Sequence, residues 1–220
     1  MSTIKNISVS ITIPTLKTEK EVKKQMIAAS HVSPDCEVIA SCIKQSAAKN
    51  RNWCIDNAKG DIIIMMDDDI TGFFPGWCDI LIDALFFHKE FSIVSARPKH
   101  ADGGYCPILG DSSNQQKIGE YQKCIHTPAT QLNICGSACV AFWRDCGIRF
   151  DEEYQGATYE DSDFCMQMNK KHPDKQIVFA NKCDIIHNEE KKGRGDGVTS
   201  KNNYWKHNHE YFAKKWGIRI

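Results

Sequence analysis

The chain has 220 residues, in which 28 Lys and Arg balance 28 Asp and Glu, and 41% of the residues are hydrophobic. This length fits one domain of ordinary size, and the composition is that of a globular protein with a substantial core. The balanced charge excludes binding of nucleic acid through the overall charge of the molecule, and no apolar run approaches the length of a membrane span. Eleven scattered cysteines without a signal peptide indicate reduced thiols and a cytoplasmic location.

The first hundred residues alternate between strand and helix patterns. We expect strands at residues 4–14, 37–43, 61–66 and 91–96, and helices at 17–30, 46–58 and 75–87. Ser46 suits the N-cap of the second helix, and Gly60 suits its stop. Repeated alternation of this kind predicts βαβ units around a parallel sheet.

The second half breaks this rhythm. Residues 100–131 lack periodicity, and so long a loop in a compact domain predicts a lid or a binding segment. The next pattern is a strand at 132–143, followed by a helix that begins near Glu160, two short strands at 177–180 and 183–186, and a tail helix at 201–217. Gly193, Gly195 and Gly197, interspersed with Lys and Arg, predict a mobile basic loop.

Residues 61–69 carry the most informative pattern, an apolar run that ends in Asp67, Asp68 and Asp69. The run suits a buried central strand, so the triplet should lie at the carboxyl edge of a parallel sheet. Side chains alternate along a strand, which places Asp67 and Asp69 on one side and Asp68 on the other. Crowded carboxylates repel one another, so the pattern predicts a divalent cation shared with phosphate. The alternative is a solvated acidic turn or a helix cap.

A second acidic cluster lies at residues 160–163. Carboxylates at the start of a helix interact favourably with its positive end, and this accounts for part of the cluster. Four polar groups exceed what a cap needs. Cys135, Cys139 and Cys146 suggest zinc ligands, but without a CxxC pair they are better interpreted as small buried hydrophobic residues.

Several short motifs follow one another along nearly the whole chain. They are Ile13-Pro14-Thr15, Ala47-Ala48-Lys49-Asn50-Arg51-Asn52, Ala58-Lys59-Gly60, Asp67-Asp68-Asp69, Pro75-Gly76-Trp77, Gly136-Ser137-Ala138-Cys139, Phe150-Asp151-Glu152, Glu160-Asp161-Ser162-Asp163, His187 and Lys215-Trp216-Gly217. Each motif alone is weak, but the ordered set resembles a glycosyltransferase of the GT-A fold, similar to glycosyltransferase family 2. The resemblance implies a single α/β (Rossmann-like) domain with a mostly parallel central sheet and helices on both faces.

The resemblance also implies an activity, which is transfer of a sugar from a nucleoside-diphosphate sugar to an acceptor hydroxyl. A bound Mn²⁺ or Mg²⁺ would act as a Lewis acid on the leaving diphosphate. The implied metal ligands are Asp67, Asp69 and His187, and an imidazole among the ligands favours Mn²⁺. The residues implied to contact the donor are Pro14, Thr15, Ser41, Arg51, Asp67, Asp68, Gly136 and Ser137.

The same resemblance assigns catalysis to the second acidic cluster. Asp161 matches the aspartate that would deprotonate the acceptor in an inverting transfer. Glu160, with Asp163, would hold the acceptor or orient this base. The implied division of the chain is a nucleotide-sugar-binding half at residues 1–98, an acceptor-binding and catalytic half at 99–200, and a C-terminal helix at 201–220 that docks on the same domain.

The substrates are less well defined than the reaction. The strand at residues 37–43 runs into Lys44-Gln45-Ser46 without the acidic residue that commonly contacts the nucleotide base in the family, so a UDP-sugar is only the default donor. The acceptor is a saccharide, a protein, a lipid or a modified DNA base. Two other functions remain open, a nucleotidyltransferase and a non-catalytic module that binds sugar nucleotides. The nucleotidyltransferase would need a Gly-rich basic loop after the first strand, where the chain has Pro14-Thr15-Leu16-Lys17.

Overall fold

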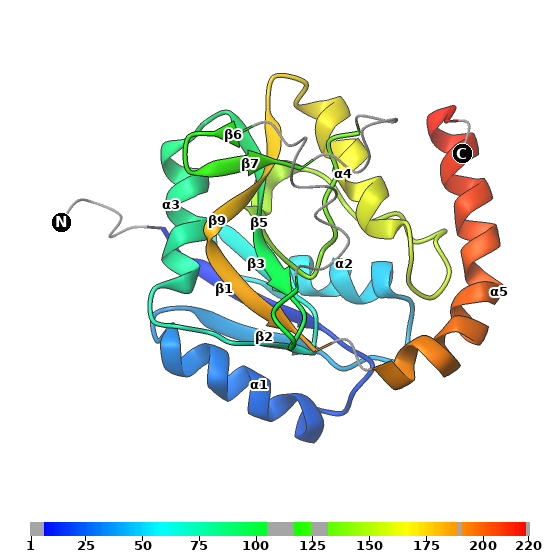
Figure 1. The fold of residues 1–220 in the computed structure, drawn as a ribbon, viewed down its shortest axis with the longest axis horizontal. Helices are drawn as coiled ribbons and strands as arrows, with labels where there is room; N and C mark the ends of the chain where they lie inside the picture. The colour runs from blue at the N-terminus through cyan, green and yellow to red at the C-terminus, as the bar shows by residue number, and fades with distance from the viewer. Residues whose placement is uncertain (1–6, 105–116, 125–131, 189–190, 219–220) are drawn as a thin grey trace.

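The computed structural model describes residues 7–104, 117–124, 132–188 and 191–218, and of residues 191–203 the backbone alone. One sheet of nine strands forms the centre of this described part (Figure 1). Six of its strands point in one direction, namely β1 (Val9–Pro14), β2 (Glu37–Ser41), β3 (Ile62–Met66), β5 (Phe91–Lys99), β6 (Lys117–Ile118) and β9 (Gln176–His187). The antiparallel strand β8 (Cys139–Trp143) lies between β3 and β5. The predicted α/β fold with a mostly parallel sheet is confirmed.

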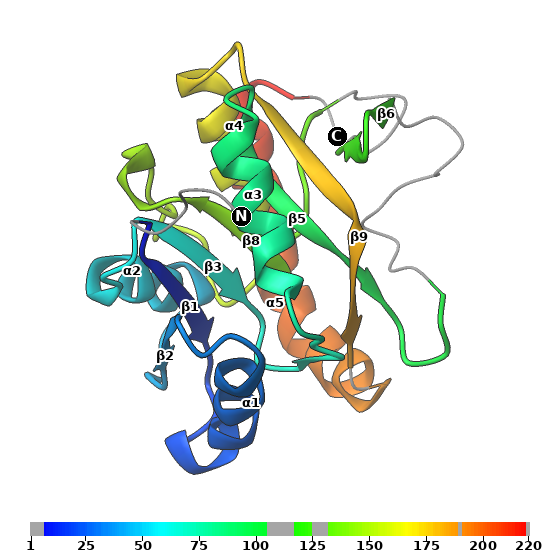
Figure 2. The same cartoon turned by 90° about the vertical axis from the view of Figure 1, so that its left-hand side faces the viewer.

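Helices cover both faces of this sheet (Figure 2). Helices α1 (Glu19–Val32) and α3 (Trp77–Phe87) pack on one face, and α2 (Ala47–Asn57) and α4 (Glu160–Lys171) pack on the other. Side chains of β3 alternate between these layers, so Ile64 shares a core with Leu81 of α3 while Met65 shares one with Phe164 of α4. An apolar run without polar alternation is therefore what this doubly covered strand requires.

The start of α2 follows the prediction, but its end does not. The Ser46 side chain accepts a hydrogen bond from the Lys49 backbone N–H, which caps the helix. The helix ends with Ala58 in extended conformation as its C-cap. Gly60 is needed for another reason, because a Cβ there would lie 2.4 Å from the backbone nitrogen of Ser10. Close approach to β1, rather than helix termination, accounts for this glycine.

Three predictions in the second half were wrong in detail. Part of the expected loop forms a hairpin of β6 (Lys117–Ile118) and β7 (Tyr121–Lys123), and β7 pairs with β9; residues 105–116 and 125–131 lie outside the described residues. The two expected short strands are a single strand, β9, whose register on β5 shifts between Ser95 and Arg97. Strand β8 is shorter than predicted because it begins only at Cys139, and the 3₁₀ helix η3 (Arg144–Cys146) follows it.

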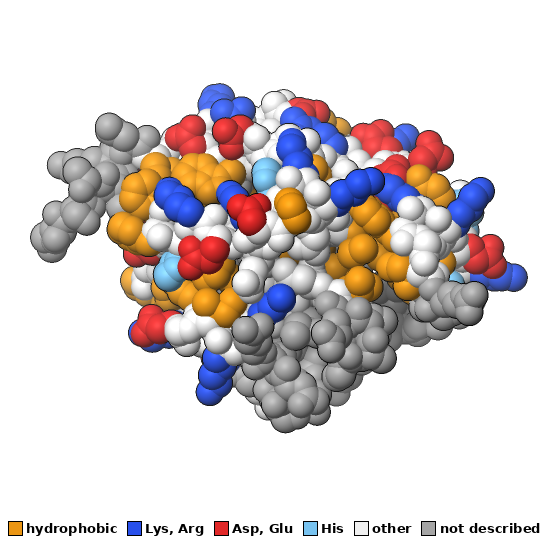
Figure 3. Space-filling model, turned by 90° about the horizontal axis from the view of Figure 1, so that it is seen from above, with side chains coloured by type: hydrophobic (Ala, Val, Ile, Leu, Met, Phe, Trp, Pro, Cys, Tyr) orange, Lys and Arg blue, Asp and Glu red, His pale blue; other side chains and the backbone are white. Residues whose placement is uncertain are grey.

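The C-terminal helix α5 spans Lys191–Trp216, so the prediction of a basic loop at its start was also wrong. Once a helix has started, each further residue adds one backbone hydrogen bond, so the helix can continue through residues with a low helix propensity. The C-terminal part of α5 packs on the chain before and within α4, and its Phe212 is buried. None of the described helices is both long and apolar enough to span a membrane. Lys and Arg side chains alternate with Asp and Glu over the described part of the face seen in Figure 3, in keeping with the balanced composition.

Candidate active site

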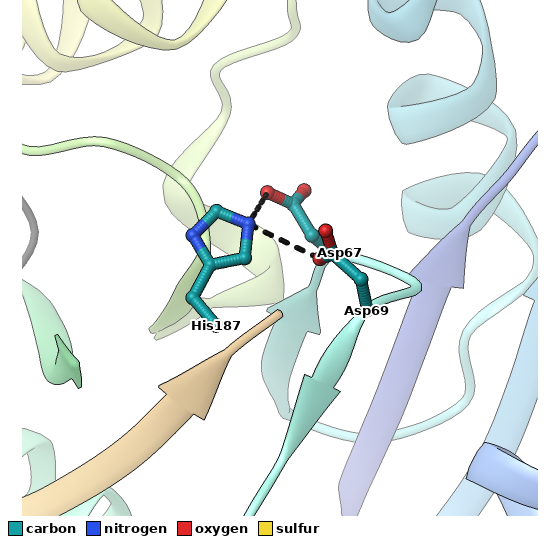
Figure 4. Close-up of side chains that lie close together, drawn as sticks. All are labelled: Asp67, Asp69 and His187. Carbon is teal, nitrogen blue, oxygen red and sulfur yellow. Dashed lines mark ion pairs between the residues drawn. The ribbon is translucent and has the colours of Figure 1, made fainter. Parts of the chain in front are cut away.

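Two strands bring a histidine to the acidic triplet. The short strand β4 (Ile70–Thr71) directly follows the triplet and pairs antiparallel with the end of β9, so that Ile70 lies opposite His187. His187 Nε2 consequently lies 3.1 Å from Asp69 Oδ1 and 3.9 Å from Asp67 Oδ2 (Figure 4). One ligand atom from each of the three residues falls within 4.8 Å of the others. This arrangement fits one cation held by two carboxylates and an imidazole.

The surroundings of the triplet also fit a cation. Asp69 Oδ1 is buried and accepts no hydrogen bond of good geometry from the described residues, although the imidazole lies beside it. Burial raises the pKa of Asp67 to about 6, with Asp69 and Asp161 adding to this effect while Arg51 and His187 oppose it. The side chain of Asp67 keeps 32% of its accessible area, so it remains open to the cleft. A divalent cation would stabilise the ionised carboxylate against both its burial and the repulsion from Asp69 and Asp161.

Asp68 points away from this group, as predicted, although it lies in the turn between β3 and β4 and not in a strand. It accepts a hydrogen bond from the Thr15 hydroxyl, and Lys17 Nζ lies 2.9 Å from its Oδ1. The first strand and the turn after it therefore anchor the middle carboxylate. Thr15 and Pro14 line the cleft beside it, where the sequence predicts donor contacts.

Arg51 joins the two acidic clusters. This arginine of α2 is 7% exposed; its Nη1 is hydrogen-bonded to Glu160, and its Nη2 lies 3.4 Å from Asp67 Oδ1. Burial lowers the pKa of Arg51, but the carboxylates of Glu160 and Asp67 outweigh burial and raise it above its ordinary value. The guanidinium is therefore a fixed positive charge between the end of β3 and the start of α4.

Asp161 is the carboxylate of the second cluster that opens into the cleft without a cationic partner among the described hydrogen bonds and ion pairs. It lies in the first turn of α4, where its Oδ1 accepts a 2.7 Å hydrogen bond from the Ser162 backbone N–H. Burial, with the neighbouring Glu160, raises its pKa above the ordinary value, and Arg51 acts in the opposite direction. A raised pKa makes this carboxylate a stronger base than an exposed aspartate.

The other carboxylates of this cluster have structural partners. Glu160 is 3% exposed, and it accepts a hydrogen bond from the Thr158 backbone N–H in addition to its pair with Arg51. Asp163 is fully buried, with Lys215 Nζ 2.8 Å and Trp216 Nε1 2.8 Å from its Oδ1. Asp163 was predicted to hold the acceptor or orient the base; its carboxylate faces α5 instead of the cleft, which argues against the first of these roles and leaves the second as a prediction.

These groups share one open cleft of about 1520 Å³ at the carboxyl edge of the sheet. Ten of the predicted site residues line it, namely Pro14, Thr15, Arg51, Asp67, Asp68, Asp69, Ser137, Glu160, Asp161 and His187. Ser41 and Gly136 are buried outside this lining, and the Ser41 hydroxyl donates to Asn50, whose side chain does line the cleft. The position of Ser41 makes it a support for the cleft wall.

Sequence reasoning missed several residues that shape the triplet. Gln25 of α1 donates to the Asp67 carbonyl at 2.7 Å, and the Asn188 side chain donates to the Asp69 carbonyl at 2.9 Å. Both hold the backbone of the triplet. Asn188 directly follows the candidate ligand His187, and this adjacency was the one available signal. Gln25 gave no comparable signal, because a glutamine on a charged surface helix does not stand out in the sequence.

Comparison with known proteins defines the class. The family model of glycosyl transferase family 2 matches residues 17–146, more than half of the chain. Among solved structures, glucosyl-3-phosphoglycerate synthase from Mycobacterium tuberculosis, in a complex with Mn²⁺, UDP-glucose and phosphoglyceric acid, superposes with a TM-score of 0.61 at 12% identity, covering 98% of this chain and 82% of that one. TarS 1–349 of S. aureus gives 0.52 at 15% identity over 83% of this chain, which spans 60% of that protein's length. No curated protein sequence matches the chain.

The chain belongs to glycosyltransferase family 2, a family of nucleotide-sugar glycosyltransferases. Its fold is GT-A, shared with these structures and with GalNAc-T7 in complex with UDP, GalNAc and Mn²⁺, which gives a TM-score of 0.55 at 12% identity over 94% of this chain and 50% of that one. At such identities the structural likeness defines the fold alone, and the substrates have to be argued from the cleft.

Proposed function

We propose that this chain moves a sugar from a nucleoside-diphosphate sugar to an acceptor hydroxyl in a metal-dependent, inverting reaction. The observation that carries the proposal is the convergence of Asp67, Asp69 and His187 within 4.8 Å in the same cleft as Asp161. A structural acidic turn needs no histidine brought in from a distant strand.

On the donor side, Asp67, Asp69 and His187 would hold Mn²⁺ or Mg²⁺. The bound ion would supply Lewis-acid stabilisation of the charge that develops on the departing diphosphate. Related structures in complex with Mn²⁺ and UDP or UDP-glucose make a UDP-sugar the first donor to test. Thr15 and Lys17 hold Asp68 at the rim, and Arg51 supplies a fixed positive charge to this wall. Ser137 lines the cleft from the segment before β8 and would complete the donor contacts.

On the acceptor side, Asp161 would accept the proton of the attacking hydroxyl as its oxygen bonds to the anomeric carbon. Its raised pKa and its position in the cleft suit a general base. Glu160, held by Arg51 and Thr158, would fix the first turn of α4 and thereby orient Asp161. Attack from the face opposite the leaving diphosphate inverts the anomeric centre.

This assignment divides the chain into functional halves. Residues 1–98 would supply most of the donor site, and residues 99–200 would supply the base and the acceptor wall. His187 crosses this division, because β9 carries a residue of the later half to the triplet of the earlier half. The C-terminal helix would support the acceptor side from residue 201 onward.

The test is donor hydrolysis in the absence of acceptor, with water replacing the acceptor hydroxyl. The purified protein is incubated with a panel of UDP-, GDP- and dTDP-sugars with Mn²⁺, Mg²⁺ or EDTA, and release of nucleoside diphosphate is followed. Slow hydrolysis of at least one donor that EDTA abolishes would support the proposal. If no donor is bound or hydrolysed with either metal, the proposal fails.

A further inference from the structure

Helix α5 presents two neighbouring exposed aromatic side chains, the first of which lines the cleft. Tyr204 is 39% exposed and Trp205 is 45% exposed, whereas most large apolar side chains of the described residues are buried. Tyr204 lines the same cleft as Asp161 and His187. The proposed donor site and proton transfer assign no role to either aromatic residue.

The ring of Tyr204 rests on the backbone of Gly156. A Cβ at this glycine would lie 2.6 Å from Cδ2 of Tyr204, and the glycine has a φ of +60°. A side chain there would therefore displace the ring as well as strain the backbone. The glycine allows an aromatic ring to lie directly on the chain that leads to Asp161.

Helix α5 also holds the segment between Gly156 and α4 in place through Asn208. Asn208 is fully buried, donates to the carbonyls of Gln155 and Thr158, and accepts from the Gln155 N–H. Thr158 and Tyr159, which directly precede α4, have positive φ values of 124° and 67°. Strained residues of this kind persist only where neighbours hold them, and Asn208 supplies that hold. Tyr204 and Asp161 are thus fixed relative to each other through one short loop.

Trp205 is also ordered. Its ring stacks on His209 with centroids 4.6 Å apart at 23°, and Tyr159 lies 6.3 Å from it. Exposed aromatic rings that are ordered in advance bind flat, apolar ligand faces at small entropic cost. Tyr204 in the cleft wall and its chain neighbour Trp205 on the exposed surface of α5 are together called the aromatic platform.

We propose that the aromatic platform is the acceptor subsite and that it binds the apolar face of a saccharide ring. The inference rests on the proposed function, because it takes Asp161 as the base. A pyranose has a C–H face that packs on an aromatic ring and equatorial hydroxyls that extend beyond it toward such a base. Six carboxylates line the cleft (Glu21, Asp67, Asp68, Asp69, Glu160 and Asp161) against three Lys and Arg side chains (Lys17, Lys24 and Arg51), and this excess of negative charge disfavours a polyanionic acceptor such as DNA.

The experiment measures binding of four methyl pyranosides by saturation-transfer NMR in the presence of UDP and diamagnetic Mg²⁺. The probes are the methyl glycosides of glucose, galactose, mannose and N-acetylglucosamine. We expect at least one to bind, with transfer strongest to the ring protons of one face. Tyr204→Ala should weaken this binding roughly five- to tenfold, as loss of one stacked ring does. Trp205→Ala should weaken it less, and Tyr204→Phe should stay within about twofold because it keeps the ring.

Calorimetric titration of UDP with each variant is the control. The affinity for UDP should stay within about twofold in Tyr204→Ala; a loss of more than fivefold would assign the ring to the nucleobase and overturn the proposal. Binding of no glycoside to the wild type, or equal binding to Tyr204→Ala, would also overturn it. Tyr204→Leu, which keeps apolar bulk without a flat ring, replaces the alanine variant if that variant does not fold. A wild type that binds none of the UDP-, GDP- and dTDP-sugars of the hydrolysis panel refutes the proposed function, whereas one that binds a donor or its nucleoside diphosphate but no glycoside refutes the subsite alone.

Discussion

The two acidic segments that meet at the cleft, residues 67–69 and 160–163, use their carboxylates in different ways. In the first, Asp67 and Asp69 converge with His187, while Asp68 is held by Thr15 and Lys17. In the second, each carboxylate has its own direction, because Glu160 is paired with Arg51 and Asp163 with Lys215. Asp161 is the one carboxylate of that segment without a cationic partner among the described ion pairs, and it lines the cleft.

This difference follows from the local backbone. The triplet lies in the tight turn between β3 and β4, which brings Asp67 and Asp69 to His187 and directs Asp68 to Thr15 and Lys17. The first turn of a helix spreads successive side chains by about 100°, so neighbouring carboxylates face different partners. A cluster of acidic residues directly after a strand therefore suits a metal site. A cluster at the start of a helix instead supplies one functional carboxylate, and its other carboxylates form structural ion pairs.

The largest effect should come from Asp161→Asn. The amide cannot accept the acceptor proton, so the transfer rate should fall by about 10²- to 10⁴-fold. Rates are measured with saturating donor, and Asp174→Asn, the same change at an exposed position after α4, is the control. Retention of more than a tenth of the wild-type rate would exclude Asp161 as the base.

The second effect concerns the first segment. Asp69→Asn should weaken Mn²⁺ binding by more than about 100-fold, because it removes a ligand and leaves His187 facing a neutral amide. Binding is followed by the electron paramagnetic resonance signal of free Mn²⁺. Asp56→Asn, which changes an exposed carboxylate paired with Arg149, should bind as the wild type does. Unchanged affinity in Asp69→Asn would place the metal elsewhere.

The third effect separates Asp163 from Asp161. Asp163→Asn should lower the free energy of unfolding by about 2 to 4 kcal/mol, because Lys215 loses the fully buried carboxylate that faces it. Urea denaturation measures this loss. The rate per folded molecule should stay within about threefold of the wild type. A stable but inactive Asp163→Asn variant would mean that this carboxylate acts in the cleft after all.

The smallest expected effect is a pH dependence of the stability that comes from the contact of Asp151 with Lys215 of α5. Burial raises the pKa of Asp151, but Lys215, the Glu153 N–H and Tyr211 together bring it below the ordinary value of 3.8. A lowered folded pKa gives a stabilisation that is complete above 3.8 and is lost as the pH falls through the folded value. Asp151→Asn should therefore be less stable than the wild type at pH 7, and the difference should shrink below pH 3.8. A difference independent of pH would argue against the ionised contact.

Local patterns predicted much of the fold. The apolar run before Asp67 identified the central strand, and alternation of strand and helix identified the parallel sheet. The opposite orientation of Asp68 was also predicted from strand periodicity, although the triplet lies in the turn between β3 and β4. Predictions failed where pairing between distant segments decides the structure, as in β9, which runs on as one strand because β5 pairs along both of its expected pieces.

The site shows the same limit. The sequence indicated which carboxylates to examine, but it gave no sign that Arg51 lies between Asp67 and Glu160, since these contacts join three separate elements. Proximity of His187 to the triplet was implied by family resemblance, and its physical cause, the pairing of β4 with β9, appears only in three dimensions. Docking of the C-terminal helix was predicted, but no local pattern indicated that its Lys215 and Trp216 would bury Asp163.

The most direct test of the division between the two segments is UDP binding in the presence of Mn²⁺, measured by calorimetry for two variants side by side. We predict that Asp161→Asn binds UDP with wild-type affinity while Asp69→Asn binds it more than about 100-fold more weakly. Equal loss of UDP binding in both variants, or loss in Asp161→Asn alone, would contradict the assignment of the donor to one segment and the base to the other.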